Sequence, residues 1–427
     1  MLYIGILIFI VVFYCIITEK VPSSWATMGG GLLMTLIGIT SQDEVLETIY
    51  DRLEVLFLLV GMMMIVLLVS ETGVFQWFAI KVAQLVRGEP FKLIILLAMV
   101  TALCSAFLDN VTTILLMAPV SILLAKQLKL DPFPFVITEV MSANIGGLAT
   151  LIGDPTQLII GAEGKLTFNE FLSNTAPMAI LSMLSLLTTV YFMYAKNMKV
   201  SNELKAKIME LDSSRSLKDI KLLKQSMIIF SLVIIGFILN NFVDKGLAMI
   251  ALSGAVFLSL LAKKSPKEMF EGVEWETLFF FIGLFMMIKG IENLDIIKFI
   301  GDKMINLTEG HFGAAVFSTM WISAAFTSII GNVANAATFS KILKIMIPTF
   351  SGVAGVAGVK ALWWALSFGS CLGGNLSLLG SATNVVAVGA ADKAGCKINF
   401  VQFLKFGGII AIENLIIASI YIYFRYL

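Results

Sequence analysis

Apolar runs long enough to cross a lipid bilayer recur along the whole chain. They contain few or no charged residues and occupy residues 2–18, 24–40, 53–69, 93–108, 178–195, 226–243, 246–262, 277–291 and 403–424. A membrane helix needs about 20 such residues to cross about 30 Å of hydrocarbon. Because only helices and closed barrels satisfy all their backbone hydrogen bonds within a bilayer, the runs predict an all-α polytopic membrane protein.

The charged fraction leaves little room for a soluble domain. Only 14% of the 427 residues are charged, against about 25% in an ordinary soluble protein. The first segment, MLYIGILIFIVVFYCIITEK, has neither a basic n-region nor a small-residue cleavage site, so we expect it to be the first membrane helix. We therefore expect a multi-pass protein of the cell (plasma) membrane, in contact with lipid and without a nucleic-acid partner.

The two halves of the chain repeat one pattern. Two pairs of segments carry the repeat: LEVLFLLVGMMMIVLL (53–68) with WETLFFFIGLFMMIKG (275–290), and IGGLATLIGDPTQLIIG (145–161) with LGGNLSLLGSATNVVAVG (372–389). The offset is 222 positions in the first pair and 227 in the second. We expect a first transmembrane repeat over 1–200, a cytoplasmic connector over 201–223 and a second transmembrane repeat over 224–427.

Amphipathic and charged segments predict the topology. The segments 74–88 and 296–310 mix apolar and charged residues, so we expect them in the membrane interface. If each half also contains a re-entrant hairpin, it crosses the membrane an odd number of times, and the halves are inverted repeats. The segment 196–224 carries eight Lys or Arg residues, which places it in the cytoplasm and both termini outside.

Gly, Pro and short polar residues interrupt the apolar pattern at four places. These are DNVTT (109–113), IGDPTQ (152–157), GNVANAAT (331–338) and LGSATNV (379–385). Such breaks expose backbone groups, which membrane proteins tolerate where they line a cavity or bind a ligand. Asp109 and Asp154 are the acids within the breaks. Asp154 precedes Pro155, so helix capping and ion binding are both consistent with its position.

The interrupted segments resemble a known superfamily. SAFLDNVTTILLMAPV (105–120), NIGGLATLIGDPTQLIIG (144–161) and CLGGNLSLLGSATNVVAVGAADKAG (371–395) are similar to signatures of the ion transporter superfamily. The branch is the one that holds arsenite permease-like, sodium/proton antiporter-like and melanocyte P-protein-like members with a citrate-transporter-like domain. The resemblance covers nearly the whole chain and implies two inverted repeats, each with a re-entrant hairpin and a broken transmembrane helix, and a homodimer.

The resemblance also implies ion binding at the hairpin tips and broken helices. The corresponding ion- or substrate-binding residues are Asp109, Asn110, Thr112, Thr113, Asn144, Gly153, Asp154, Thr156, Asn332, Asn335, Ser381, Thr383 and Asn384. Asp109, Asn110 and Asp154 are the candidate Na⁺ ligands, with Na⁺ or H⁺ as the coupling ion and no other cofactor. We expect Asp109 to be the principal ligand, because it is the one ionisable group at a hairpin tip in either repeat. Gly331 stands where relatives tend to have the second tip's acid, so the two sites are expected to be unequal.

The leading functional hypothesis is a secondary active transporter that works by alternating access, and not an enzyme. No G-x-x-x-x-G-K-[ST] phosphate loop is present, so ATP-driven transport would need a separate ATPase subunit. The expected substrate is a small inorganic ion or arsenite-like oxyanion, or Na⁺ exchanged for H⁺, with a sodium-coupled carboxylate such as citrate as the alternative. A passive channel and an intramembrane aspartyl protease are alternatives from other classes, but Leu151 departs from the protease motif G-x-G-D.

Overall fold

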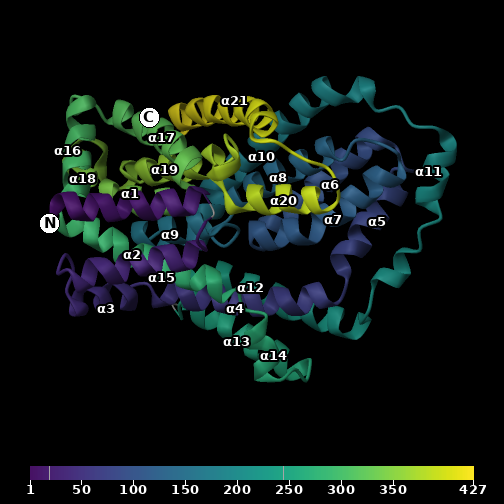
Figure 1. Cartoon of the computed structure of the whole chain (residues 1–427), viewed down its shortest axis with the longest axis horizontal. Helices are drawn as coiled ribbons and strands as arrows, with labels where there is room; N and C mark the ends of the chain where they lie inside the picture. Colours follow the sequence, from purple (N-terminus) through teal and green to yellow (C-terminus); the bar gives the residue numbers. More distant parts are fainter. Residues whose placement is uncertain (19, 244) are drawn as a thin grey trace.

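The structure is a computed structural model that describes residues 1–18, 20–243 and 245–427, and these residues form an all-helical fold (Figure 1). The first half contains α1 (Leu2–Thr18), α2 (Ser23–Leu36), α3 (Gln42–Tyr50), α4 (Leu53–Glu71), α5 (Val74–Leu85), α6 (Pro90–Ser105), α7 (Asn110–Gln127), α8 (Phe133–Leu148), α9 (Pro155–Gly164) and α10 (Phe168–Tyr194). The linking segment contains η1 (Ala195–Asn197), α11 (Asn202–Met209) and η2 (Ser213–Ser216).

The second half contains α12 (Ile220–Val243), α13 (Leu247–Leu261), α14 (Pro266–Glu271), α15 (Trp275–Asn293), α16 (Ile296–Leu307), α17 (Phe312–Ile330), α18 (Asn332–Gly358), α19 (Lys360–Gly373), η3 (Leu378–Gly380), α20 (Ala382–Lys393) and α21 (Phe400–Tyr426). Among the described residues, α4, α7, α10, α12, α17 and α21 are long and apolar enough to cross a membrane individually, and α1, α6, α8 and α13 are shorter apolar helices. The predicted fold class, an all-α polytopic membrane protein, is confirmed.

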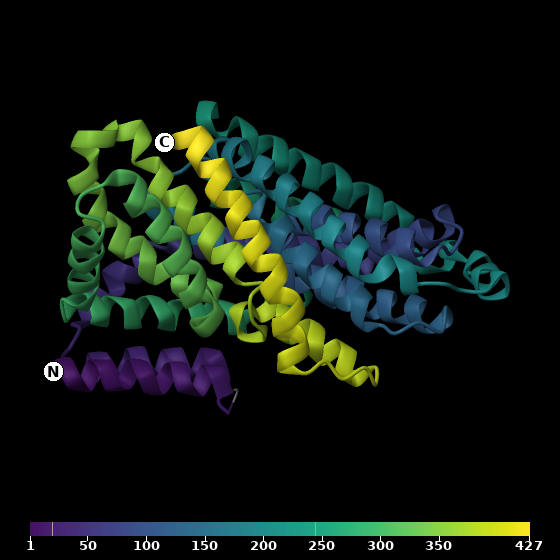
Figure 2. The ribbon, with the colours of Figure 1, turned by 90° about the horizontal axis from the view of Figure 1, so that it is seen from above.

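The order of α1–α10 recurs in α12–α21. The corresponding helices α5 and α16 lie at opposite ends of the molecule: Figure 1 places α5 at the end occupied by α11, and α16 at the other end, near the N-terminus. Both chain termini lie toward the end that holds α16 (Figures 1 and 2). Figure 2 also shows α1 along one edge, where the side chains of Leu7, Ile10 and Tyr14 are exposed and can contact lipid.

Helices of each half pack against helices of the other half. Helix α2 packs on α15, and α13 packs on α4. A Cβ added to Gly61 of α4 would lie 2.8 Å from the backbone of Ala251, and one added to Gly283 of α15 would lie 2.4 Å from the backbone nitrogen of Met28. The glycines that align between the repeats therefore permit the same close helix contact twice.

A second contact between helices is also repeated in the two halves. It joins the first helix of each hairpin (α6–α7 and α17–α18) to the first helix of each broken helix (α8–α9 and α19–α20). Helix α6 packs on α8, and α17 packs on α19. A Cβ added to Gly146 would lie 2.2 Å from the carbonyl oxygen of Ala102, and one added to Gly373 would lie 2.6 Å from the Cα of Ala324. Each glycine thus lets the first helix of a hairpin approach the broken helix directly.

The segment between the halves packs against α5. Gln84 Nε2 donates a hydrogen bond to the Leu211 carbonyl oxygen at 2.6 Å, and Lys205 Nζ lies 2.7 Å from Glu89 Oε1. Gly73 permits this contact, because its Cβ would lie 1.9 Å from the carbonyl oxygen of Ser216. The predicted 201–223 connector is therefore a charged segment attached to the first half.

Candidate functional site

Four helix N-termini meet in the middle of the molecule. Helices α7, α9, α18 and α20 begin at the four predicted breaks. Helix α7 packs on α20 of the other half, and α18 packs on α9. A cavity of about 840 Å³ is lined by residues from all four starts. The positive ends of four helix dipoles therefore face one polar region.

Asp154 lies at the centre of this region and is only 1% exposed. Its Oδ2 accepts hydrogen bonds from Asn110 Nδ2 at 2.6 Å and from Asn332 Nδ2 at 3.1 Å, while its Oδ1 accepts one from the Thr156 backbone N–H at 2.7 Å. The carboxylate therefore caps α9 and joins the tips of both hairpins. The two interpretations of Asp154, helix cap and ion ligand, remain compatible.

Asp109 lies beside this network and faces the cavity. It caps α7, because its carboxylate accepts from the backbone N–H groups of Val111 at 3.1 Å and Thr112 at 2.8 Å. The Thr112 hydroxyl also donates to Asp109 Oδ2 at 2.6 Å and lies 3.4 Å from Glu274 Oε1. Asp109 is more exposed than Asp154, so its charge is less costly and more readily hydrated.

Asn144 connects the two broken helices. Its Nδ2 donates to Asn375 Oδ1 at 2.7 Å and to Asn384 Oδ1 at 3.0 Å, and its Oδ1 lies 3.3 Å from Ser381 Oγ. Asn384 Nδ2 in turn donates to the Gly374 carbonyl oxygen at 2.8 Å. The amides thereby satisfy backbone groups that the helix breaks expose.

Three backbone carbonyl groups converge around Gly153. A Cβ at this position would lie 2.7 Å from the Ser105 oxygen, 2.9 Å from the Gly147 oxygen and 3.0 Å from the Ala106 oxygen. A side chain would therefore collide with the backbone of the hairpin tip and of the broken helix. Carbonyl, amide and carboxylate oxygens are ligands for hard cations, and the Na⁺ site near Gly153 and Asp154 stays a prediction.

The second repeat builds a different, neutral arrangement. Gly331 has φ +85°, a left-handed conformation that favours glycine over aspartate. Asn335 Nδ2 donates to Ser323 Oγ and Ser370 Oγ, both at 2.8 Å. The structure therefore brings Asn332, but not the side chain of Asn335, to Asp154.

Two further predicted residues make no side-chain hydrogen bond to the other described residues at the centre. Thr383 is buried and lines the cavity. Thr113 is buried, and its hydroxyl has no hydrogen-bond partner among the described residues. Their roles in binding stay predictions.

Three polar residues of the site were missed by the motif comparison. Glu274 lines the cavity, Cys371 Sγ lies 3.7 Å from Asp154 Oδ2, and Asn375 binds Asn144. Glu274 could have been considered, because it is an acid that directly precedes the repeated apolar segment 275–290. Asn375 lies within the segment LGGNLSLLG, whereas the position of Cys371 could be recognised only from helix packing.

The cavity is acidic at its polar end. Asp109, Asp154, Glu274 and Glu276 line it, and the lining that the structure describes contains neither Lys nor Arg. Burial, followed by the negative charge of Asp109, raises the pKa of Glu274. Aliphatic, aromatic and methionine side chains form most of the remaining wall. Such a surface attracts cations and disfavours an unaccompanied polyanion.

Comparison with known proteins agrees with this architecture. A family model described as "Citrate transporter" matches residues 13–369. The chain belongs to the citrate transporter family. A "46 kDa membrane protein" of Mycobacterium leprae is 34% identical over 99% of both chains. An uncharacterized transporter of Mycobacterium tuberculosis is 32% identical over 99% of this chain and 98% of that protein.

Two further comparisons concern a longer relative and a solved structure. The human P protein is 32% identical over 93% of this citrate transporter family member, which spans 56% of the P protein. The crystal structure of the Alcanivorax borkumensis YdaH transporter covers 92% of this chain and 87% of its own, with a TM-score of 0.60 and 14% sequence identity. The YdaH comparison shows the fold. Together these findings confirm the superfamily resemblance and the membrane transporter class.

Proposed function

We propose that the protein is a secondary active transporter in which a cation bound at Asp154 drives alternating access between two inverted repeats. The observation that carries this proposal is the convergence of both hairpin tips and the first broken helix on one buried carboxylate, beside which Asn144 binds Asn384 of the second broken helix. Binding a cation at this position neutralises Asp154 and links both halves of the molecule. Na⁺ and H⁺ are the two candidate coupling ions.

The proposed substrate is a small carboxylate that enters together with cations. The family description favours a carboxylate over an arsenite-like oxyanion. Because the described lining supplies four acids and no basic side chain, the cations must neutralise the substrate. The cavity volume of about 840 Å³ accommodates a small organic acid, since ligand pockets usually measure about 300–1,000 Å³.

Cation exchange without a carboxylate is the second candidate. The same acidic lining favours it, because an exchanger of Na⁺ for H⁺ needs carboxylates in a water-accessible cavity and no anion site. The two candidates differ in whether flux of a carboxylate accompanies flux of the cation.

Transport in proteoliposomes separates these functions. The purified protein is reconstituted, and uptake of labelled citrate and other small carboxylates is measured with and without Na⁺ and with imposed pH gradients. A pH-sensitive dye inside the vesicles reports H⁺ movement. We expect carboxylate uptake that requires a cation and shows counterflow. Cation-driven H⁺ flux without carboxylate uptake would favour exchange, and flux without counterflow would indicate a channel.

A further inference from the structure

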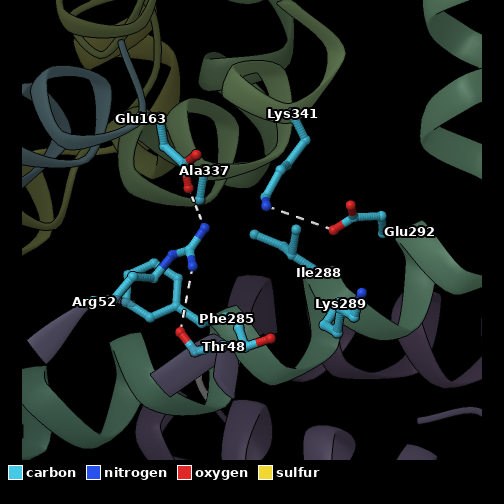
Figure 3. Close-up of a pocket in the computed structure, with 9 residues that line it drawn as sticks. All are labelled: Thr48, Arg52, Glu163, Phe285, Ile288, Lys289, Glu292, Ala337 and Lys341. Atoms are coloured by element: carbon cyan, nitrogen blue, oxygen red, sulfur yellow. Dashed lines mark hydrogen bonds and ion pairs between the residues drawn. The ribbon is translucent and has the colours of Figure 1, made fainter. Parts of the chain in front are cut away.

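An ionic cluster lies between helices of the two halves (Figure 3), and the residues around it are different from those that line the large cavity. Glu163, near the end of α9, is ion-paired with Arg52, which directly precedes α4, and its other oxygen lies 2.5 Å from Lys344 Nζ of α18. The side chains of Arg52 and Glu163 are only 11% and 8% exposed. The Arg52 guanidinium also lies 4.9 Å from the ring centre of Phe285 in α15.

A second ion pair extends the cluster. Lys341 of α18 lies 3.6 Å from Glu292 of α15, and Figure 3 shows both side chains beside the Arg52 group. The space left between these residues is about 10 Å³, roughly enough for one water molecule. The ion pairs therefore fill the space between α4 and α15 on one side and α9 and α18 on the other.

The cluster and the cavity lie at opposite ends of the same helices. Arg52 precedes the first residue of α4, whereas the cavity is lined by residues up to Ser70 near the end of that helix. Glu292 is near the end of α15, whereas the cavity is lined by its first residue, Trp275. The cavity therefore reaches the Asp154 region from one end, and the cluster occupies the other.

Two short helical segments connect the cluster to the site. The N-terminus of α9 is capped by Asp154, and Glu163 lies near its C-terminus. Helix α18 begins with Asn332, which binds Asp154, and carries Lys341 further along. A movement of either helix that opens a path to Asp154 must separate Glu163 and the lysines from Arg52 and Glu292.

The repeat provides no equivalent cluster at the cavity end. Arg52 aligns with Glu274 and Lys341 aligns with Pro119 at the offset of 222, and Glu163 aligns with Ala390 at the offset of 227. These counterparts supply an acid and two uncharged residues, which cannot form the same pairs. Suppose that the protein passes from one state to the other when each repeat adopts the conformation of the other repeat. The ionic cluster then stabilises only one of the two states.

We propose that the Arg52–Glu163–Lys344 cluster is a one-sided ionic gate, which closes the path to Asp154 from its own end and must open in each transport cycle. This proposal rests on one part of the proposed function, namely that the protein alternates between two states that open at opposite ends. It does not depend on the identity of the substrate. Because the gate is present in one state only, it also favours the state described here, in which the cavity is open at the opposite end.

Two cysteine reporters test the gate without transport. In a background with Cys15, Cys104, Cys371 and Cys396 replaced by Ala or Ser, Ala337→Cys reports on the cluster, because Ala337 is buried beside it. Ala382→Cys reports on the open end, because Ala382 is exposed in the large cavity. The rate of modification by a small, charged thiol reagent is measured for each reporter in purified protein.

Breaking the gate should move the two rates in opposite directions. We expect Arg52→Gln and Glu163→Gln each to raise the rate at position 337 about tenfold or more and to lower the rate at position 382. The double variant should not exceed the larger single effect, because both substitutions remove the same pair. Lys205→Gln, which breaks the connector pair with Glu89, is the matched control and should change neither rate.

Each other outcome contradicts the gate. If the rate at position 337 stays within about twofold in both variants, the cluster does not close this end. If both reporter rates rise together, the substitutions have loosened the protein rather than shifted it between two states. Size-exclusion elution and melting temperature identify unfolded variants, and Lys344→Gln, which leaves the Arg52–Glu163 pair, provides a milder variant with an intermediate rate.

Discussion

Replacing Asp154 with Asn is expected to remove cation binding and also to weaken the hydrogen bonds that join the two hairpin tips. Asp154 accepts hydrogen bonds from Asn110 and Asn332 through Oδ2 and from the Thr156 backbone through Oδ1. An amide retains the Thr156 bond through its oxygen, but its Nδ2 faces two donors. The substitution therefore disturbs contacts of Asp154 and also removes its charge, and the measurement must separate these effects.

The loss of charge dominates the effect on the cation. A unit charge about 4 Å from another contributes about 4 kcal/mol at an effective dielectric constant of about 20, which is about a thousandfold in Kd. A cation present at about 100 times its Kd stabilises the native protein by about 2.7 kcal/mol. In Asp154→Asn the same concentration is about a tenth of Kd, so the stabilisation falls below about 0.1 kcal/mol.

The assay is the thermal stability of the purified protein with and without Na⁺, in a series of Na⁺ concentrations and at two pH values. The melting temperature without Na⁺ reports the disturbed hydrogen bonds, and its increase with Na⁺ reports the ion site. Asp109→Asn is the matched variant, because an asparagine still caps α7. We expect it to keep most of the Na⁺-dependent increase.

The comparison of the two variants decides which aspartate is the principal ligand. The motif comparison predicted Asp109, and the burial and partners of Asp154 favour Asp154. If Asp154→Asn keeps the full Na⁺ response while Asp109→Asn loses it, the argument from burial is wrong. If the wild-type protein responds to pH but not to Na⁺, the coupling ion is H⁺.

Three further substitutions test other parts of the site and the topology. Gly153→Ala should weaken cation binding at least about tenfold and lower stability by about 1–3 kcal/mol, because its Cβ would lie 2.7 Å from the Ser105 oxygen; titration of the melting temperature with Na⁺ measures both. Asn332→Asp places a second acid beside Asp154, and because two close carboxylates resist joint ionisation, Na⁺ stabilisation should require a more alkaline pH; an unchanged pH profile would contradict this. Ser214→Cys, at an exposed position of the connector, should be shielded from an impermeant thiol reagent outside intact cells, and labelling from outside would reverse the topology.

Several features of the fold could be predicted because their causes are local in the sequence. Apolar runs of sufficient length dictate membrane helices, and Asp154 before Pro155 dictates the start of α9. The repeated glycines Gly61 and Gly283 indicated equivalent positions, which the structure explains by close contacts with a neighbouring helix. A helix or a cap depends on neighbouring residues, so one sequence contains the necessary information.

Other features were decided by helix packing over long sequence distances. Asn332 reaches Asp154 although 178 residues separate them, whereas Asn335, three positions later, binds Ser323 and Ser370 instead. Both asparagines belong to the same motif, and only the rotation of α18 determines which one faces the ion site. Motif similarity therefore identified the helix but not the contact of each side chain.

The ionic cluster is the clearest case of a feature that only the tertiary structure could determine. The sequence places Arg52 in a charged loop and Glu163 at the end of a short helix, separated by 111 positions. Nothing in either segment indicates the other, because a salt bridge requires only opposite charges at a short distance and chains contain many such pairs. The packing of α4 and α15 against α9 and α18 brings these charges together and removes them from water.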